Sequence, residues 1–160
     1  MQTYSVGIAE YQLAQAPDSL TARGLGSCLA IILYDPTRRC GGMAHVLLPT
    51  PRPGLSVEQP ATYVATGIDV LIEELEASGS LRQDLVAKLV GGSQMFEAFS
   101  ERVEAIGGRN ITAALEAFRE LQIPVVAQET GGNFGRSLEF DLASGEVVIK
   151  SLRSHVPMRI

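Results

Sequence analysis

The fold is decided by residues 24–48, which read GLGSCLAIILYDPTRRCGGMAHVLL. Residues 28–34 and 42–48 are apolar runs of strand length, typical of strands that are buried on both faces. Between them, Asp35-Pro36-Thr37 is a turn signal, because proline fixes φ and cannot donate a hydrogen bond to a ladder. The two runs are therefore predicted to pair as a hairpin.

This hairpin is predicted to bring a cysteine and a histidine together. If the turn centres on Pro36-Thr37, Cys28 faces His45, and cross-strand partners share one face with Cβ atoms about 4.5–5.5 Å apart. A shift of two residues moves His45 to a diagonal position that is still within side-chain reach. An imidazole beside a thiol can take its proton and stabilise the nucleophilic thiolate. The backbone N–H groups around Gly26 and Ser27 are candidates for an oxyanion hole.

The alternative is that Cys28 is an inert core residue, since free cysteine is among the most buried residue types. Cys40 has no histidine at matching register and is predicted to be structural or at the surface. His155 is predicted to be solvated. A metal site built from Cys28, Cys40, His45 and His155 lacks the ligand-pair spacing of zinc sites, so neither a metal nor another cofactor is expected.

The rest of the chain predicts a mixed architecture. A helix is expected over 61–77, where apolar residues fall on one face, and another over 111–121, with Asn110 or the preceding glycines as its cap. A short helical turn is expected around 95–99. About seven strands without strict alternation favour an α+β fold over a doubly wound parallel sheet. Besides the hairpin, strands are expected at 6–13, 19–25, 85–90, 125–128, 137–142 and 146–152.

Length and composition set the class of protein. The 160 residues suit one domain covering 1–160, with a polar tail from about residue 151, and 46% hydrophobic content excludes a disordered chain. The longest apolar run, 28–34, is far shorter than the ~20 residues of a membrane span, so no membrane insertion is expected. No signal peptide is visible and two cysteines make no disulfide framework, which predicts a cytoplasmic protein. A net charge of −5 and the absence of tryptophan argue against nucleic-acid binding.

Several short blocks, in order along the chain, resemble one family, the chemoreceptor glutamine deamidases (CheD). No block is specific alone, but GLGSC and GGMAH at this separation are. The match runs from about Val6 to Lys150. The blocks are GLGSC at 24–28, YDP at 34–36, GGMAH at 41–45, LP at 48–49, AKLVGGS at 87–93, MF at 95–96, IGGRN at 106–110, TGGN at 130–133, Gly135-Arg136, and Gly145 with Val148 and Lys150.

The resemblance implies a function, a fold and partners. The family hydrolyses particular glutamine side chains to glutamate on the cytoplasmic helices of bacterial chemoreceptors, and its members bind a CheC-type chemotaxis phosphatase. Cys28 matches the family's nucleophile and His45 its general base. The fold implied is an α/β/β/α arrangement of mixed sheets that resembles bacterial toxin-type cysteine deamidases.

One position departs from the family pattern, which has a threonine six residues before the cysteine to orient the histidine. Here that position is Ala22, and Thr21 is one residue earlier. In a regular strand a one-residue shift turns a side chain to the other face, whereas a β-bulge between Thr21 and Gly24 restores it. Thr21 is therefore the candidate third member of the site, with a backbone carbonyl as the alternative orienting group for His45.

Three functions remain open. The leading hypothesis is glutamine deamidation through a thioester on Cys28, with His45 protonating the departing ammonia. The second is a non-catalytic or weakly catalytic adaptor that binds a CheC-type phosphatase, which only the Thr21 shift favours. The third is a cysteine-dependent transglutaminase or peptidase, which shares the chemistry but differs in the acceptor.

Overall fold

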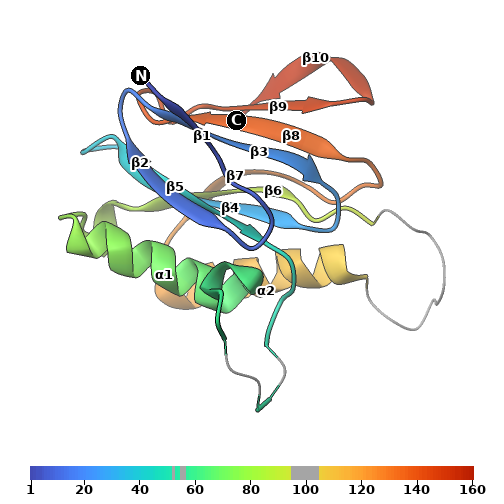
Figure 1. Cartoon of the computed structure of the whole chain (residues 1–160), viewed down its shortest axis with the longest axis horizontal. Helices are drawn as coiled ribbons and strands as arrows, with labels where there is room; N and C mark the ends of the chain where they lie inside the picture. The colour runs from blue at the N-terminus through green and yellow to red at the C-terminus, as the bar shows by residue number, and fades with distance from the viewer. Residues whose placement is uncertain (52, 55–56, 95–104) are drawn as a thin grey trace.

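The computed structural model describes residues 1–51, 53–54, 57–94 and 105–160, which form two stacked sheets with helices beneath (Figure 1). We call the two sheets the outer sheet and the central sheet. The outer sheet has the order β1(Thr3–Ser5), β3(Ser19–Leu25), β8(Arg136–Asp141), β9(Val147–Ser151), β10(Ser154–Arg159). The central sheet has the order β2(Tyr11–Gln15), β5(Cys40–Val46), β4(Leu29–Asp35), β6(Val86–Gly91), β7(Val125–Thr130).

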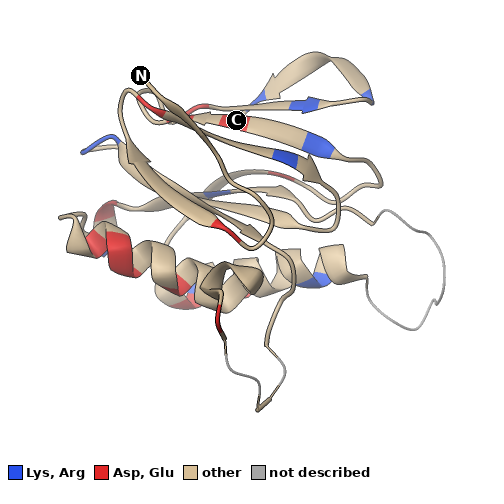
Figure 2. Ribbon diagram, in the orientation of Figure 1, with Lys and Arg blue, Asp and Glu red and all other residues tan. Residues whose placement is uncertain are grey.

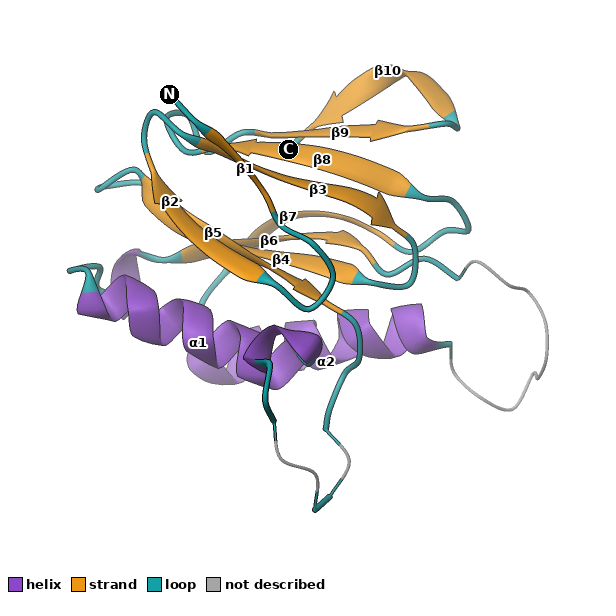
Figure 3. Cartoon of the chain, viewed as in Figure 1, coloured by secondary structure: helices purple, strands orange, loops and turns teal. Residues whose placement is uncertain are grey.

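Both long helices, α1(Val64–Ala77) and α2(Ile106–Leu121), cover the same face of the central sheet (Figure 3). Short 3₁₀ turns at Pro60–Thr62 and Arg82–Asp84 precede α1 and β6. Within the described residues, no helix is long and apolar enough to cross a membrane.

Strand β4 lies at the centre of the molecule, and every residue in it is buried. Leu29, Ile31 and Leu33 pack against the helices, while Ala30 and Ile32 pack against the outer sheet. A strand with two buried faces has no polar alternation, which is why residues 28–34 form an unbroken apolar run. The prediction of a buried hairpin here is confirmed.

The register of that hairpin differs from the prediction by two residues. Asp35 pairs with Cys40, and Ala30 pairs with His45, so a four-residue loop replaces the expected two-residue turn. The Asp35 carboxylate accepts hydrogen bonds from the backbone N–H groups of residues 37 and 38, which holds the longer loop. His45 therefore lies diagonal to Cys28 rather than directly opposite it.

The layer order also differs from the α/β/β/α arrangement that the resemblance implied. In the described part of the chain, both helices lie on the central sheet and none covers the outer sheet. The reason is chemical: the open face of the outer sheet presents exposed polar side chains such as Arg23, Glu139 and Lys150, and basic residues mark its strands in Figure 2. Such a face has little apolar area to bury under a helix.

The predicted single strand over 6–13 is wrong. The chain forms β1, which pairs in parallel with β3 in the outer sheet, and then crosses to β2, which pairs with β5 in the central sheet. The crossing includes Ala9 at a φ of 65°. The hydrophobic pattern of residues 6–13 does not reveal this crossing, because the two short strands pair with distant strands in different sheets.

Two further predictions are adjusted, and a third is not tested. Residues Ser154–Arg159, expected as part of a polar tail, form β10, which pairs with β9 while all six residues stay exposed and so show no buried face in the sequence. Helix α2 begins at Ile106 instead of residue 111, so Asn110 lies inside the helix and is not its cap. The predicted helical turn at 95–99 lies outside the described residues.

Candidate active site

Cys28 lies at the end of a tightly held loop that leads from β3 into β4. The backbone N–H of Ser93 donates to the Gly26 carbonyl at 2.8 Å, and that of Gly92 donates to the Cys28 carbonyl at 2.9 Å. Gly91 leaves no room beside this loop, since a Cβ there would lie 2.5 Å from the Cys28 carbonyl oxygen. The Gly91-Gly92-Ser93 segment at the end of β6 therefore fixes the position of Cys28.

Cys28 and His45 approach the same region between the two sheets. The Cys28 side chain belongs to the apolar cluster that also contains Ala30, and Ala30 pairs with His45 in the β4–β5 ladder. Cross-strand partners share a face, so the thiol and the imidazole lie on the same side of the central sheet. Only 6% of Cys28 and 1% of His45 is exposed.

The His45 ring is held in one orientation by a backbone group. Its Nδ1 lies 3.1 Å from the Val6 carbonyl oxygen, and because a carbonyl only accepts, Nδ1 carries the proton. Nε2 is then the basic nitrogen, and it is buried with no hydrogen-bond partner in the described part of the chain. The ring is oriented as a general base requires.

Burial keeps both reactive groups neutral. It lowers the pKa of His45, against smaller opposing effects of the Val6 carbonyl and the charge of Glu10. Burial raises the pKa of the Cys28 thiol above its ordinary value, against a smaller lowering effect of its own backbone N–H. Both shifts favour the neutral forms, a thiol and an imidazole, over a thiolate–imidazolium ion pair.

The structure does not bring Thr21 to His45. Its hydroxyl donates to the Tyr4 carbonyl at 3.4 Å, whereas the next residue, Ala22, is fully buried in the cluster between the sheets. The β3–β8 register does shift between Ala22 and Leu25, but this irregularity begins after Thr21 and leaves the Thr21 side chain on the open face. The carbonyl of Val6 occupies the orienting position beside His45.

The loop at Gly26 and Ser27 has its donors free and its acceptors engaged. The carbonyls of Gly26, Ser27 and Cys28 all accept hydrogen bonds. The N–H groups of Gly26 and Ser27 donate to no residue in the described ranges. Such a row of free N–H groups beside a nucleophile is what an oxyanion hole requires.

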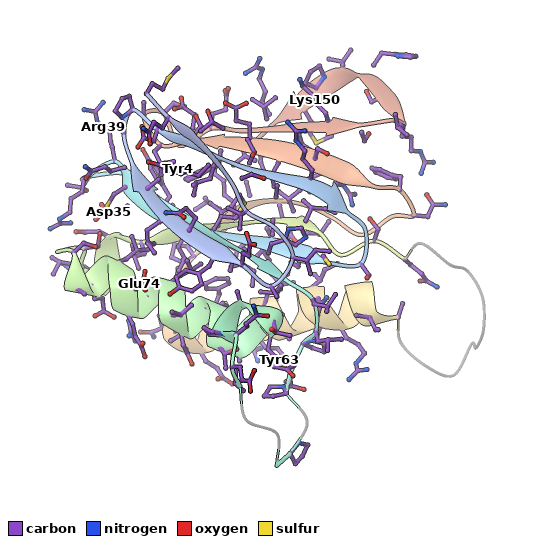
Figure 4. All side chains as sticks on the ribbon, viewed as in Figure 1. Tyr4, Asp35, Arg39, Tyr63, Glu74 and Lys150 are labelled. Carbon is purple, nitrogen blue, oxygen red and sulfur yellow. The ribbon has the colours of Figure 1, made fainter. Side chains whose placement is uncertain are left out.

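The remaining sulfur and imidazole groups lie elsewhere. Cys40 is at the opposite end of β5 from His45, with Sγ 3.5 Å from the Ser80 hydroxyl, near the turn where Figure 4 labels Asp35 and Arg39. His155 is exposed on β10. These placements agree with the structural and solvated roles predicted for them.

Sequence analysis missed one group at this site and misjudged another. Val6 contributes a backbone carbonyl, which has no side-chain signature in a sequence. Asn110 was expected as a helix cap, yet it is fully buried and contacts the loop before Cys28. Its place in the IGGRN block was the available signal.

Comparison with known proteins gives consistent matches. Residues 47–151 match the family described as CheD chemotactic sensory transduction. A probable chemoreceptor glutamine deamidase CheD 2 from Geobacter metallireducens is 45% identical over 95% of both chains. A probable chemoreceptor glutamine deamidase CheD from Desulforamulus reducens is 41% identical over 97% of this chain and 93% of its own. One of the same description from Lachnoclostridium phytofermentans is 45% identical over 92% of both.

Proposed function

The chain belongs to the CheD family, and on that premise we propose that it hydrolyses glutamine side chains of bacterial chemoreceptors to glutamate, with Cys28 as nucleophile and His45 as base. One observation carries the proposal: His45 presents a bare, oriented Nε2 on the sheet face that Cys28 shares. We place the reaction in the cytoplasm, on the cytoplasmic helices of the receptors. The chain's own residues supply every proton transfer, and no cofactor is used.

In the first half of the reaction, His45 Nε2 takes the thiol proton as Cys28 Sγ attacks the carboxamide carbon. The free N–H groups of Gly26 and Ser27 donate to the oxyanion that forms. When the C–N bond breaks, the imidazolium returns its proton to the leaving nitrogen, and ammonia departs. The product is a thioester between Cys28 and the former glutamine.

In the second half, His45 takes a proton from water as the water oxygen attacks the thioester. The C–S bond breaks, the sulfur regains the proton from His45, and a glutamate side chain is released. The Val6 carbonyl holds Nδ1–H throughout and stabilises the imidazolium each time it forms, as the third member of a triad does.

The neutral resting pair is compatible with this sequence of steps. Catalytic hydrogen bonds are often long in a free enzyme and tighten only when substrate binds. Proton transfer from Cys28 to His45 then takes place as the bound carboxamide draws charge onto sulfur.

The test is the intact mass of a receptor cytoplasmic fragment, together with released ammonia, after incubation with the protein. Each deamidation replaces an NH₂ group by OH and raises the mass accordingly. Cys28→Ala is expected to abolish both signals while the protein stays folded, and the matched variant Cys40→Ala is expected to retain them. Activity that survives in Cys28→Ala but is lost in Cys40→Ala would overturn the proposal.

A second candidate is an adaptor that binds a CheC-type phosphatase with little or no catalysis. The observation that favours it is the position of Thr21, which faces away from His45. Binding of the phosphatase without ammonia release from any receptor fragment would support the adaptor. Incorporation of an added primary amine in place of hydrolysis would instead indicate a transglutaminase.

A further inference from the structure

We propose that Asn110 is a positioning residue that sets the separation of Cys28 and His45. It reaches the site from α2 and is fully buried. Its side-chain Nδ2 donates to the Ser27 carbonyl at 3.0 Å and to the Leu47 carbonyl at 3.2 Å. One amide thus joins the residue before the nucleophile to the segment that follows the base.

This link lies where the backbone pairing of the two strands stops. The β4–β5 ladder ends at the pair Leu29 and Val46, so Cys28 lies just beyond its last rung. Leu47 turns away there, and its backbone N–H donates to the Thr62 carbonyl. The two hydrogen bonds of Asn110 continue the connection across the gap that the ladder leaves. Within the described residues, no other hydrogen bond joins Ser27 or Cys28 directly to Leu47.

The helix that carries Asn110 is itself anchored to the loop that holds Cys28. A Cβ at Gly107 would lie 2.4 Å from the Ser93 carbonyl oxygen and 2.6 Å from that of Gly92, so the helix packs directly on that segment. The same segment donates to the carbonyls of Gly26 and Cys28. Asn110 is therefore attached to a rigid base, and movement of its amide is restricted.

Stability alone does not account for an asparagine here. Its Oδ1 is buried with no partner in the described part of the chain, which is costly for an amide. Leucine has nearly the same branched shape and a higher helix propensity. The Oδ1 of this buried amide makes no hydrogen bond within the described residues. The presence of asparagine here is therefore best explained by the two hydrogen bonds that Nδ2 donates.

The inference rests on the proposed function, and its test uses a receptor cytoplasmic fragment as substrate. Asn110→Leu keeps the number and branching of the side-chain heavy atoms and introduces no charge, but removes both donors. We expect kcat to fall about 100-fold, the usual scale for a displacement of about 1 Å at a reacting centre. We expect KM to stay within about twofold, because the substrate-binding surface is unchanged. A purely structural residue would not divide its effect between kcat and KM in this way.

The matched control is Ala114→Gly, a fully buried position one turn further along α2 that contacts the helix-side core. It weakens the same helix without touching either catalytic segment, so it is expected to lower Tm and leave kcat within about twofold. If leucine prevents folding, Asn110→Ala removes both donors without adding bulk or charge to the helix, and is expected to give the same loss of kcat.

Three outcomes would overturn the inference while the proposed function stands. They are a kcat for Asn110→Leu equal to that of Ala114→Gly, an effect confined to KM, and loss of the fold in both Asn110 variants, which would make the residue structural. Full activity in Cys28→Ala would instead remove the proposed function itself.

Discussion

At the scale of single residues, the contact between the Val6 carbonyl and the His45 ring affects the pKa of the imidazole. A carbonyl fixes the tautomer without adding a full negative charge, so burial dominates and the pKa of the imidazole is lowered. The His45 imidazole therefore stays neutral, with Nε2 able to accept a proton, on the acidic side of neutrality. A carboxylate in the same place would oppose this by favouring the imidazolium.

The lowered pKa of His45 predicts a stability that depends on pH. Below about pH 6.5, His45 binds a proton in the unfolded chain but stays neutral in the folded protein. The free energy of unfolding therefore falls as the pH drops towards the pKa of His45 in the folded protein. The slope is at most about 1.4 kcal/mol per pH unit for this group. Urea unfolding of the protein and of His45→Gln at pH 7.5 and 5.5 measures it. The difference in the free energy of unfolding between the protein and His45→Gln should be smaller at pH 5.5 than at pH 7.5. An equal or larger difference at pH 5.5 would contradict a lowered pKa for His45.

A second prediction at this scale concerns Thr21. Among the described residues, its hydroxyl donates to the Tyr4 carbonyl and not to His45, so Thr21→Ala should leave kcat within about twofold. Steady-state ammonia release from a receptor fragment measures this. A loss of tenfold or more would mean that the hydroxyl reaches His45 during turnover and that the Val6 carbonyl is insufficient.

At the scale of elements, the β4–β5 hairpin shows which features a sequence reveals. The apolar runs identified both strands, because burial on two faces leaves a composition signal. The predicted register was wrong by two residues, because the loop has four residues instead of two. The Asp35 carboxylate accepts a backbone hydrogen bond within this loop, and Arg39 takes a φ of 52° there. The shared face of Cys28 and His45 survived the error, since a shift of two residues keeps side chains on the same side.

The end of β6 gives a prediction for a pair of glycines. Gly91 and Gly79 have φ values of 111° and 108°, so alanine strains the backbone by about 1–3 kcal/mol at either. A Cβ at Gly91 would also lie 2.5 Å from the Cys28 carbonyl oxygen, whereas a Cβ at Gly79 would have no atom of the described residues within 4 Å. Gly91→Ala should therefore lower kcat about 10- to 100-fold. Gly79→Ala should lower stability alone.

Urea unfolding and ammonia release, measured on both glycine variants, separate strain from displacement. Equal losses of kcat in the two variants would show that general strain, and not the contact with Cys28, governs the activity.

At the scale of the whole molecule, a buried arginine joins the two sheets near the active site. Arg136 of β8 donates to the Ser93 hydroxyl at 2.8 Å and pairs with Glu129 of β7 at 3.1 Å. Its guanidinium also stacks 4.2 Å from the centre of the Phe134 ring. The outer sheet is thereby connected to the segment that holds the Cys28 loop.

Removing this connection should cost much more than removing an exposed ion pair. Arg136→Met is expected to lower the free energy of unfolding by about 2–3 kcal/mol, because a buried pair is broken while Glu129 keeps partial access to water. Arg159→Met, which removes an exposed pair with Glu146, should cost less than about 1 kcal/mol. Urea unfolding of the two variants compares them, and similar losses would mean that Arg136 does not join the sheets energetically.

The global arrangement was the hardest part to predict. The mixed α+β class followed from the order of strands and helices, and Ser19–Leu25 was predicted with its observed bounds. The crossing between sheets after β1 depends on pairing between distant segments, which no local pattern encodes. The same crossing delivers the Val6 carbonyl to His45, so the group that orients the base could not be named from the sequence.

The burial of Cys28 has a consequence for the lifetime of the protein in the cell. Peroxide oxidises thiolates far faster than protonated thiols, and a cysteine converted to sulfinic acid is not generally recovered. A thiol with a raised pKa and little exposure resists that damage between encounters with substrate. The same burial that makes the Cys28 thiol less reactive at rest therefore also protects it from oxidation.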